Sequence, residues 1–120
     1  MRFMMLLPAP AEVLETKVSN PDMELVGAMH KYNEEMTKAG VLLAAEGLHP
    51  TSKGTRIQVS GGKRIITDGP FTEAKEVVAG FWIIEVRSKE EAIEWAKRCP
   101  LPECGVIEIR EVYETCVSPA

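Results

Sequence analysis

A bend near the middle of the chain constrains the fold more than any other stretch. It is the tripeptide Asp68-Gly69-Pro70, which follows a run of β-forming residues and precedes a charged segment. Proline fixes its own φ angle and keeps the preceding residue out of the α-helical region, whereas glycine tolerates backbone angles that other residues avoid. The chain must therefore turn here, and the carboxylate of Asp68 is held just before the turn, where it can accept backbone N–H bonds or face a cleft.

The segment before this bend has the pattern of a β-hairpin. Residues 55–60 and 63–67 are rich in β-forming side chains and are separated by Gly61-Gly62, which is typical of a two-residue turn with positive φ angles. The register that follows pairs Ile57 with Ile66, Val59 with Arg64, Gln58 with Ile65 and Arg56 with Thr67. One face is then moderately apolar and the other mixed. This pattern indicates a partner surface or a cleft wall, although a solvated hairpin has the same pattern.

A helix is predicted over residues 21–39. Asn20 suits the cap, Pro21 the first helical position, and Gly40 the left-handed position after the end. Apolar side chains recur at three- and four-residue spacing, which favours a helix with one buried face. These side chains are Leu25, Val26, Met29, Tyr32 and Met36.

The remaining segments complete an α+β pattern. A capping box at Ser88–Glu91 opens a second helix that Pro100 ends. Strands are predicted over residues 2–7, 41–48, 77–86 and 106–113, and residues 8–19 are predicted to form a loop. The order of elements is ferredoxin-like: two helices on one face of an antiparallel sheet, with the hairpin as an added arm. The other sheet face then needs cover, and the simplest cover is the same face of a second copy, which predicts a homodimer.

Composition excludes several classes of protein. A chain of 120 residues with 14 basic and 18 acidic residues, net charge −4, is expected to form one domain over residues 1–120 and not to bind nucleic acid. No apolar run approaches the roughly 20 residues needed to span a bilayer, and the apolar run before Pro8 is short for a signal peptide. Three cysteines, all in the last quarter, form no disulfide framework. We therefore expect a cytoplasmic protein that does not associate with membranes.

The stretch around the bend also resembles a known family. Asp68-Gly69-Pro70-Phe71 followed by Glu73-Ala74-Lys75-Glu76 is similar to the DGPF signature of the YCII-related proteins. The segments 44–50 and 80–84 fit the same resemblance, which extends from Arg2 to Val112. It implies a dimeric α+β barrel, in which two ferredoxin-like sheets pack face to face. One departure is Ala74, where the family usually has a hydroxyl residue before the lysine, so no hydroxyl or charged role at this position is carried over.

Asp68 and His49 are the candidate catalytic residues. Each lies at the end of a predicted strand beside a proline, so the two are expected near the same edge. A carboxylate close to an imidazole stabilises its charged form and orients its tautomer, as a general acid or base requires, and the family resemblance implies such a pair. The alternative is that Asp68 accepts N–H bonds from Phe71 or Thr72 in a turn, while His49 is a surface residue.

Several residues near the bend are candidates for ligand binding. Arg56 and Arg64 can bind an anion through paired N–H groups, or can simply keep an exposed hairpin soluble. Glu73 and Lys75 can line a cleft or belong to a solvated charged loop, and Trp82 is either core or the floor of a pocket. The full set of candidates is Arg56, Arg64, Phe71, Glu73, Lys75 and Trp82. We expect no metal site and no cofactor, because the chain has no metal-binding motif of adequate strength and no nucleotide-binding glycine loop.

Two classes of function fit these residues. The first is a small cofactor-independent enzyme, of lyase or isomerase type, that uses Asp68 and His49 for proton transfer on a small organic molecule. The second is a non-catalytic ligand-sensing or interaction module, for example an accessory to an alternative sigma factor, a role that the family resemblance implies in bacteria. A dry concave pocket flanked by both residues favours the enzyme. A flat rim with Asp68 bonded to backbone N–H groups favours the module.

Overall fold

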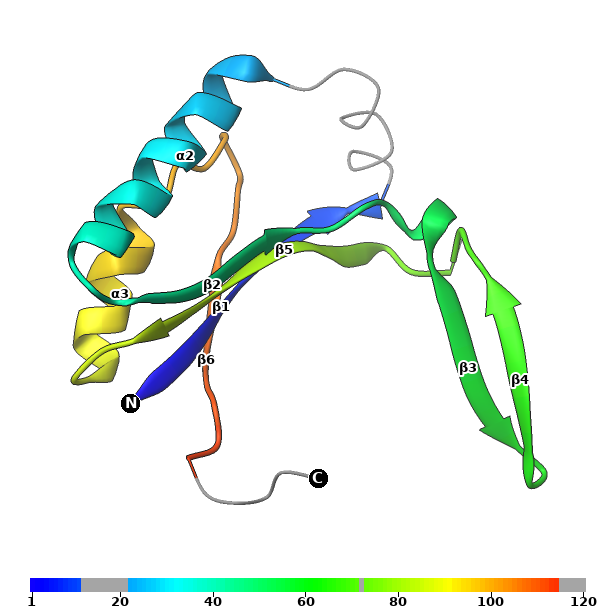
Figure 1. The fold of residues 1–120 in the computed structure, drawn as a ribbon. Helices are drawn as coiled ribbons and strands as arrows, with labels where there is room; N and C mark the ends of the chain where they lie inside the picture. The colour runs from blue at the N-terminus through cyan, green and yellow to red at the C-terminus, as the bar shows by residue number, and fades with distance from the viewer. Residues whose placement is uncertain (12–21, 72, 115–120) are drawn as a thin grey trace.

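The structure, a computed structural model, describes residues 1–11, 22–71 and 73–114. Two helices lie on one side of a strand layer, and a separate two-stranded arm extends from the far end of that layer (Figure 1). The elements are β1 (Arg2–Pro10), α2 (Met23–Lys38), β2 (Leu42–Gly47), the 3-10 turn η1 (Thr51–Lys53), β3 (Thr55–Ser60), β4 (Lys63–Asp68), β5 (Glu76–Glu85), α3 (Lys89–Lys97) and β6 (Glu108–Glu111).

The central sheet has the order β2-β5-β1-β6. Strand β1 is central and pairs antiparallel with both β5 and β6, and β5 pairs antiparallel with β2. Counting only these strands, the first lies between the third and the fourth, as in ferredoxin-like folds. The fold class predicted from the sequence is thereby confirmed.

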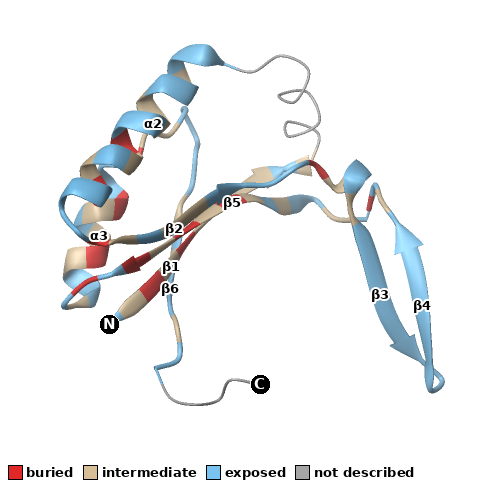
Figure 2. Ribbon diagram, in the orientation of Figure 1, coloured by how far each residue is buried: buried red, intermediate tan, exposed pale blue. Residues whose placement is uncertain are grey.

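The register of β1 and β5 assigns each side chain to one of two faces. Phe3 lies opposite Ile84, and Met5 lies opposite Trp82. These four side chains form the core together with buried residues of α2 and α3, which appear red in Figure 2. Because side chains alternate along a strand, the residues between them point to the other side of the sheet.

We call this other side the open face. Its apolar residues are only half-buried or exposed, because no helix of the described chain covers them. They are Met4, Leu6, Pro8, Ala44, Val78, Phe81 and Ile83, and the charged residues Glu46, Glu76, Glu108 and Arg110 lie among them in the strand register.

Helix α2 begins two residues later than predicted. Its N-cap is Asp22, whose carboxylate accepts the N–H groups of Glu24 and Leu25 at 3.1 and 3.2 Å. The cap expected at Asn20 is therefore wrong, and aspartate suits a cap as well as asparagine does. Residues 20 and 21 lie outside the described residues. The predicted end is confirmed, since Gly40 has a φ angle of 74°. The N–H groups of Gly40 and Val41 donate to the carbonyls of Thr37 and Met36, which is a Schellman motif.

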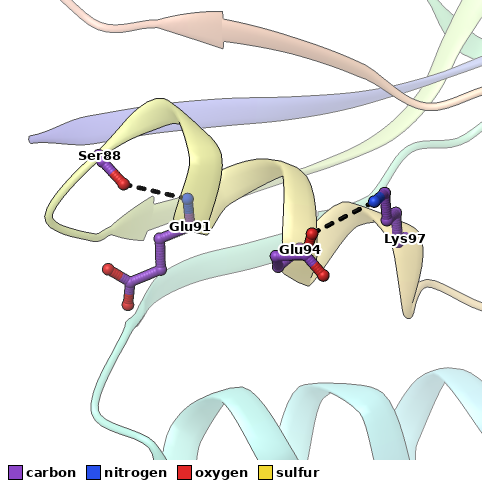
Figure 3. Close-up of polar contacts among 4 residues, drawn as sticks. All are labelled: Ser88, Glu91, Glu94 and Lys97. Carbon is purple, nitrogen blue, oxygen red and sulfur yellow. Dashed lines mark hydrogen bonds and ion pairs between the residues drawn. The ribbon is translucent and has the colours of Figure 1, made fainter.

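The capping box at the start of α3 is present in a modified form, and its bond between Ser88 and Glu91 is drawn in Figure 3. The Ser88 hydroxyl accepts the N–H of Glu91 at 3.1 Å. The Glu91 carboxylate reaches back to the N–H of Arg87 at 2.9 Å, one residue earlier than the reciprocal bond of a standard box. One turn further on, Glu94 and Lys97 form an exposed ion pair at 3.2 Å.

Two hydrogen bonds join the helices to each other and to the sheet. The Tyr32 hydroxyl donates to the Trp95 carbonyl at 2.7 Å, and the Trp82 indole N–H donates to Asn33 Oδ1 at 2.7 Å. The rings of Tyr32 and Trp82 meet edge to face with centroids 5.8 Å apart. Burial raises the pKa of Tyr32, so its hydroxyl stays protonated and keeps donating. These contacts bind α2 to both α3 and β5.

The arm formed by β3 and β4 has the predicted register throughout. Ile57 lies opposite Ile66 and Val59 lies opposite Arg64, and the turn residues Gly61 and Gly62 have φ angles of 58° and 78°. Every residue of both strands is exposed, and the arm is pale blue along its whole length in Figure 2.

The prediction that the first strand ends at Pro8 is wrong. Strand β1 continues to Pro10 through an irregularity between Leu7 and Pro8. The prolines are tolerated because β6 pairs with β1 only as far as Leu6, so beyond that point one edge of β1 needs no N–H donor. Residues 12–19 of the predicted loop lie outside the described residues.

The last strand, β6, covers Glu108–Glu111 and is shorter than the predicted range 106–113.

Among the residues that the structure describes, no helix is long and apolar enough to cross a membrane. The same part of the chain has no group of three or more histidine, cysteine, aspartate or glutamate side chains arranged to hold a metal ion.

We predict that the cap of α3 contributes more to stability than its surface ion pair. Ser88→Ala should lower the free energy of unfolding by about 1 kcal/mol, because the Glu91 N–H loses its acceptor. The matched variant Lys97→Gln should change it by less than about 0.5 kcal/mol, because both partners are exposed. Urea unfolding followed by circular dichroism at one protein concentration measures both. Equal losses in the two variants would contradict the assignment of Ser88 as the cap.

Candidate functional site

The base of the arm is the candidate site, and we call it the arm corner. It consists of residues 49–56, 68–71 and 73. The N–H of Gly69 donates to the carbonyl of Gly54 at 2.8 Å. The hydroxyl of Thr55 donates to Asp68 Oδ1 at 3.0 Å, so the two strands of the arm are joined at their base by one backbone bond and one side-chain bond.

The corner requires glycine at residue 69. A Cβ atom there would lie 1.7 Å from the carbonyl oxygen of Thr51, a distance at which the backbone itself must move. The segment around Asp68 therefore packs directly against η1, two residues after His49. The peptide bond between Gly69 and Pro70 is cis.

Three of the predicted ligand-binding residues contact one another within the corner. Phe71 is buried, and the guanidinium of Arg56 lies 3.9 Å from the centre of its ring. The same guanidinium forms an ion pair with Glu73. The pKa of Glu73 is lowered by its own backbone N–H and by Arg56. Arg56 thus has a partner on its face and a partner at its edge, which orients it along the corner.

The structure brings the His49 and Asp68 segments together but does not join their side chains. Both residues are exposed, and within the described residues no hydrogen bond or ion pair links them. Asp68 accepts its hydrogen bond from Thr55, not from the turn N–H of Phe71 that the alternative interpretation expected. Thr72, the other expected donor, lies outside the described residues.

The remaining candidates lie apart from this group. Arg64 is exposed next to the turn at the tip of the arm, and Lys75 is exposed just before β5. Trp82 is buried against α2 and uses its indole N–H on Asn33. Trp82 therefore lies on the covered face of the sheet, where it serves the core.

Two hollows of the described surface lie away from Asp68 and His49. One of about 580 Å³ lies beside Met1, Val41, Val86 and Glu91. The other, of about 250 Å³, is on the open face, with Leu6, Pro8 and Val78 as its apolar part and Glu76, Glu108 and Arg110 as its charged part. Neither is the dry pocket beside Asp68 and His49 that proton-transfer chemistry needs.

Sequence reasoning missed Thr55 and Thr51 as members of the corner. Thr55 had a usable signal, because the predicted pairing of Arg56 with Thr67 puts Thr55 opposite Asp68. Thr51 had none, since its contact with Gly69 depends on how the chain turns between β2 and β3. The charged residues of the open-face hollow also escaped notice, because they come from strands far apart in the sequence.

We predict that Gly69→Ala destabilises the protein by about 1–3 kcal/mol, because the added methyl meets the Thr51 carbonyl. Gly27→Ala is the matched control, since nothing lies within 4 Å of its Cβ position on α2. This control should raise stability by about 0.5–1 kcal/mol through helix propensity. Urea unfolding gives both values. Faster hydrogen exchange at the Gly54 amide should accompany the Gly69 loss, and an unchanged stability would show that the corner is looser than described.

Comparisons with known proteins agree with the resemblance around the bend. The model of the YCII-related domain family matches residues 1–115. The chain is also 35% identical over 89 residues to an uncharacterized protein of Rhizobium meliloti (strain 1021), and the aligned part covers 72% of this chain and 68% of the relative. The match spans the sheet, both helices and the arm corner, and from it we conclude that the chain belongs to the YCII-related family.

Proposed function

We propose that the protein is a homodimeric interaction and ligand-binding module whose dimer interface is the open face. The observation that carries this proposal is the apolar centre of that face. Met4 lies opposite Ile83, and Leu6 lies opposite Phe81, in the two central strands. A contiguous apolar patch on a small chain marks an interaction surface.

A second copy is the partner that fits this surface with the least further assumption. In a two-fold dimer each protomer presents the same patch to the other, so an apolar centre meets an apolar centre. The charged residues of the face lie beside this centre, on the flanking strands β2 and β6 and at the start of β5, which resembles the polar rim of protein interfaces. The open-face hollow beside Leu6 and Pro8 is then covered by the partner and becomes an enclosed space for a small organic molecule.

Ligand binding in this space would use its own charged groups. Glu76 and Glu108 lie on either side of β1, and Arg110 lies on β6. Carboxylates and a guanidinium around an apolar floor suit a small molecule that has both polar and apolar parts. An accessory role beside an alternative sigma factor is the regulatory form of this proposal, and it rests on the family resemblance alone.

Light scattering tests the dimer. We expect the mass of two chains at micromolar concentration for the native protein and the mass of one chain for Phe81→Glu, because a charge at the centre of the face cannot be desolvated without a partner. Met23→Glu is the matched control, since Met23 is 70% exposed on α2, and it should remain dimeric. Circular dichroism confirms that both variants fold. A monomeric native protein would refute the proposal.

A second candidate function is proton transfer at the arm corner by Asp68 and His49. The observation that favours it is the contact between their segments, where Gly69 packs on the Thr51 carbonyl. One Asp68 oxygen accepts from Thr55, which leaves the other oxygen able to accept from an imidazole. Such a pair would supply a general acid and base without any cofactor.

Titration by NMR separates this candidate from a purely structural corner. His30→Gln leaves His49 as the single imidazole signal, since the chain has two histidines. If the residues are coupled, the midpoint of the His49 signal should lie at lower pH in Asp68→Asn than with Asp68 present, because the carboxylate stabilises the imidazolium. Identical midpoints in the two proteins would remove the proton-transfer candidate and leave the binding module.

A further inference from the structure

The arm has an apolar face that nothing in the described chain covers. Ile57, Val59 and Ile66 share this face in the strand register, and their side chains are 65%, 63% and 70% exposed. Strands β3 and β4 form a sheet of their own and pair with no other described strand. A two-stranded hairpin is marginally stable in water by itself, so this face lacks the contacts that usually support such an element.

The arm is nevertheless built to hold one direction. At its base, Gly69 and Gly54 share a backbone bond, and Thr55 binds Asp68. Arg56 lies on the ring of buried Phe71. These contacts connect the first and last residues of the arm to η1 and to the segment before β5. An exposed apolar face on an anchored support is a surface arranged for contact.

Charge indicates what the arm contacts. Lys63 and Arg64 lie at its tip, and among the described residues neither has an ion pair. The open face carries three exposed glutamates that likewise have no ion pair in the described part of the chain, and Arg110 lies on the same face, two residues from one of them on β6. These glutamates are Glu46, Glu76 and Glu108. The arm tip and the open face are thus of opposite charge, and both combine that charge with exposed aliphatic side chains.

The arrangement in space agrees with such a contact. The helices lie on one side of the sheet, whereas the arm extends from its end toward the other side, which is the side of the open face (Figure 1). Within one chain the arm stands clear of the sheet, and Lys63 and Arg64 have no acidic partner among its described residues. A second chain facing the open face brings its own glutamates to the side on which the arm extends.

We propose that the arm binds a second copy of this chain, with the face of Ile57, Val59 and Ile66 packed on the partner. Arg64, which shares that face, lies against the glutamates of the partner's open face, and Lys63, on the other face at the tip, adds to the positive charge there. The proposal rests on the homodimer proposed above and adds a second contact to it. The arm of each protomer then contacts the other protomer, and the arm corner of one chain lies at the edge of the space that the two open faces enclose. The electrostatic part sets the register of the two chains, as charge complementarity does at other interfaces.

Photo-cross-linking tests which surface the arm touches. A benzophenone amino acid at residue 57 is used in dimers mixed from ¹⁴N and ¹⁵N chains, so that a link between chains is distinguished by mass from a link within one. We expect links between chains that map to β1, β2, β5 or β6. The same probe at residue 58, on the opposite face of the arm, should give at least tenfold fewer. Links only within the chain, or equal yields at both positions, would overturn the proposal.

A second measurement separates the arm contact from the dimer itself. The double variant Ile57→Ser, Ile66→Ser should raise the dimer dissociation constant at least tenfold. The double variant Lys63→Glu, Arg64→Glu should also raise this constant, by a larger factor at low salt than at high salt. The Gln58→Ser control should leave it unchanged. If the native protein is a monomer, both proposals fail. If the native protein is a dimer and all the arm variants leave its dissociation constant unchanged, the proposed arm contact is refuted and the proposed open-face dimer is retained.

Discussion

The pairing of β1 with β5 determines most of this structure, because it sorts side chains to two faces and only one of them is covered. Phe3, Met5, Trp82 and Ile84 meet beneath α2 and α3. Because side chains alternate along the same strands, the neighbours of these core residues point to the open face. A strand that supplies residues to the core therefore also supplies residues to the uncovered side. The described chain has two helices in the layer above the sheet and no element below it. The open face is therefore a direct consequence of the core.

The arm corner introduces a separate constraint, which concerns backbone atoms. Gly69 lies so close to the Thr51 carbonyl that a side chain does not fit, so the base of the arm packs directly on η1. The charged residues of the arm and its corner have two different roles. Arg56 and Glu73 neutralise each other over Phe71, so they stabilise the corner. Lys63 and Arg64, at the other end of the arm on β4, have no such partner among the described residues and are available to other molecules.

Local patterns predicted the elements of this fold well, and contacts between distant segments account for what they missed. The Gly61-Gly62 turn and the alternation around it determine the arm register, and both are visible in the sequence. The ferredoxin-like order follows from the sequence of strands and helices. The helix cap was predicted at Asn20 and not at Asp22, because Asn20, Pro21 and Asp22 each carry a signal for the start of a helix. The site was harder to predict, since proximity of His49 and Asp68 in the fold follows from strand ends, whereas the choice of Thr55 as the partner of Asp68 depends on side-chain geometry.

The catalytic and the interaction hypotheses are linked by the exposure of the corner. An ion pair between exposed groups gains at most about 1 kcal/mol in water, which is too little to hold an imidazole in one orientation beside Asp68. Thr55 already competes for that carboxylate, and neither of the two hollows described above is lined by it. Proton transfer at this corner therefore needs another surface to exclude water and strengthen the electrostatic interaction. The open face and the arm are the parts of the described chain that can recruit such a surface, so an enzyme here would first have to be an interaction module.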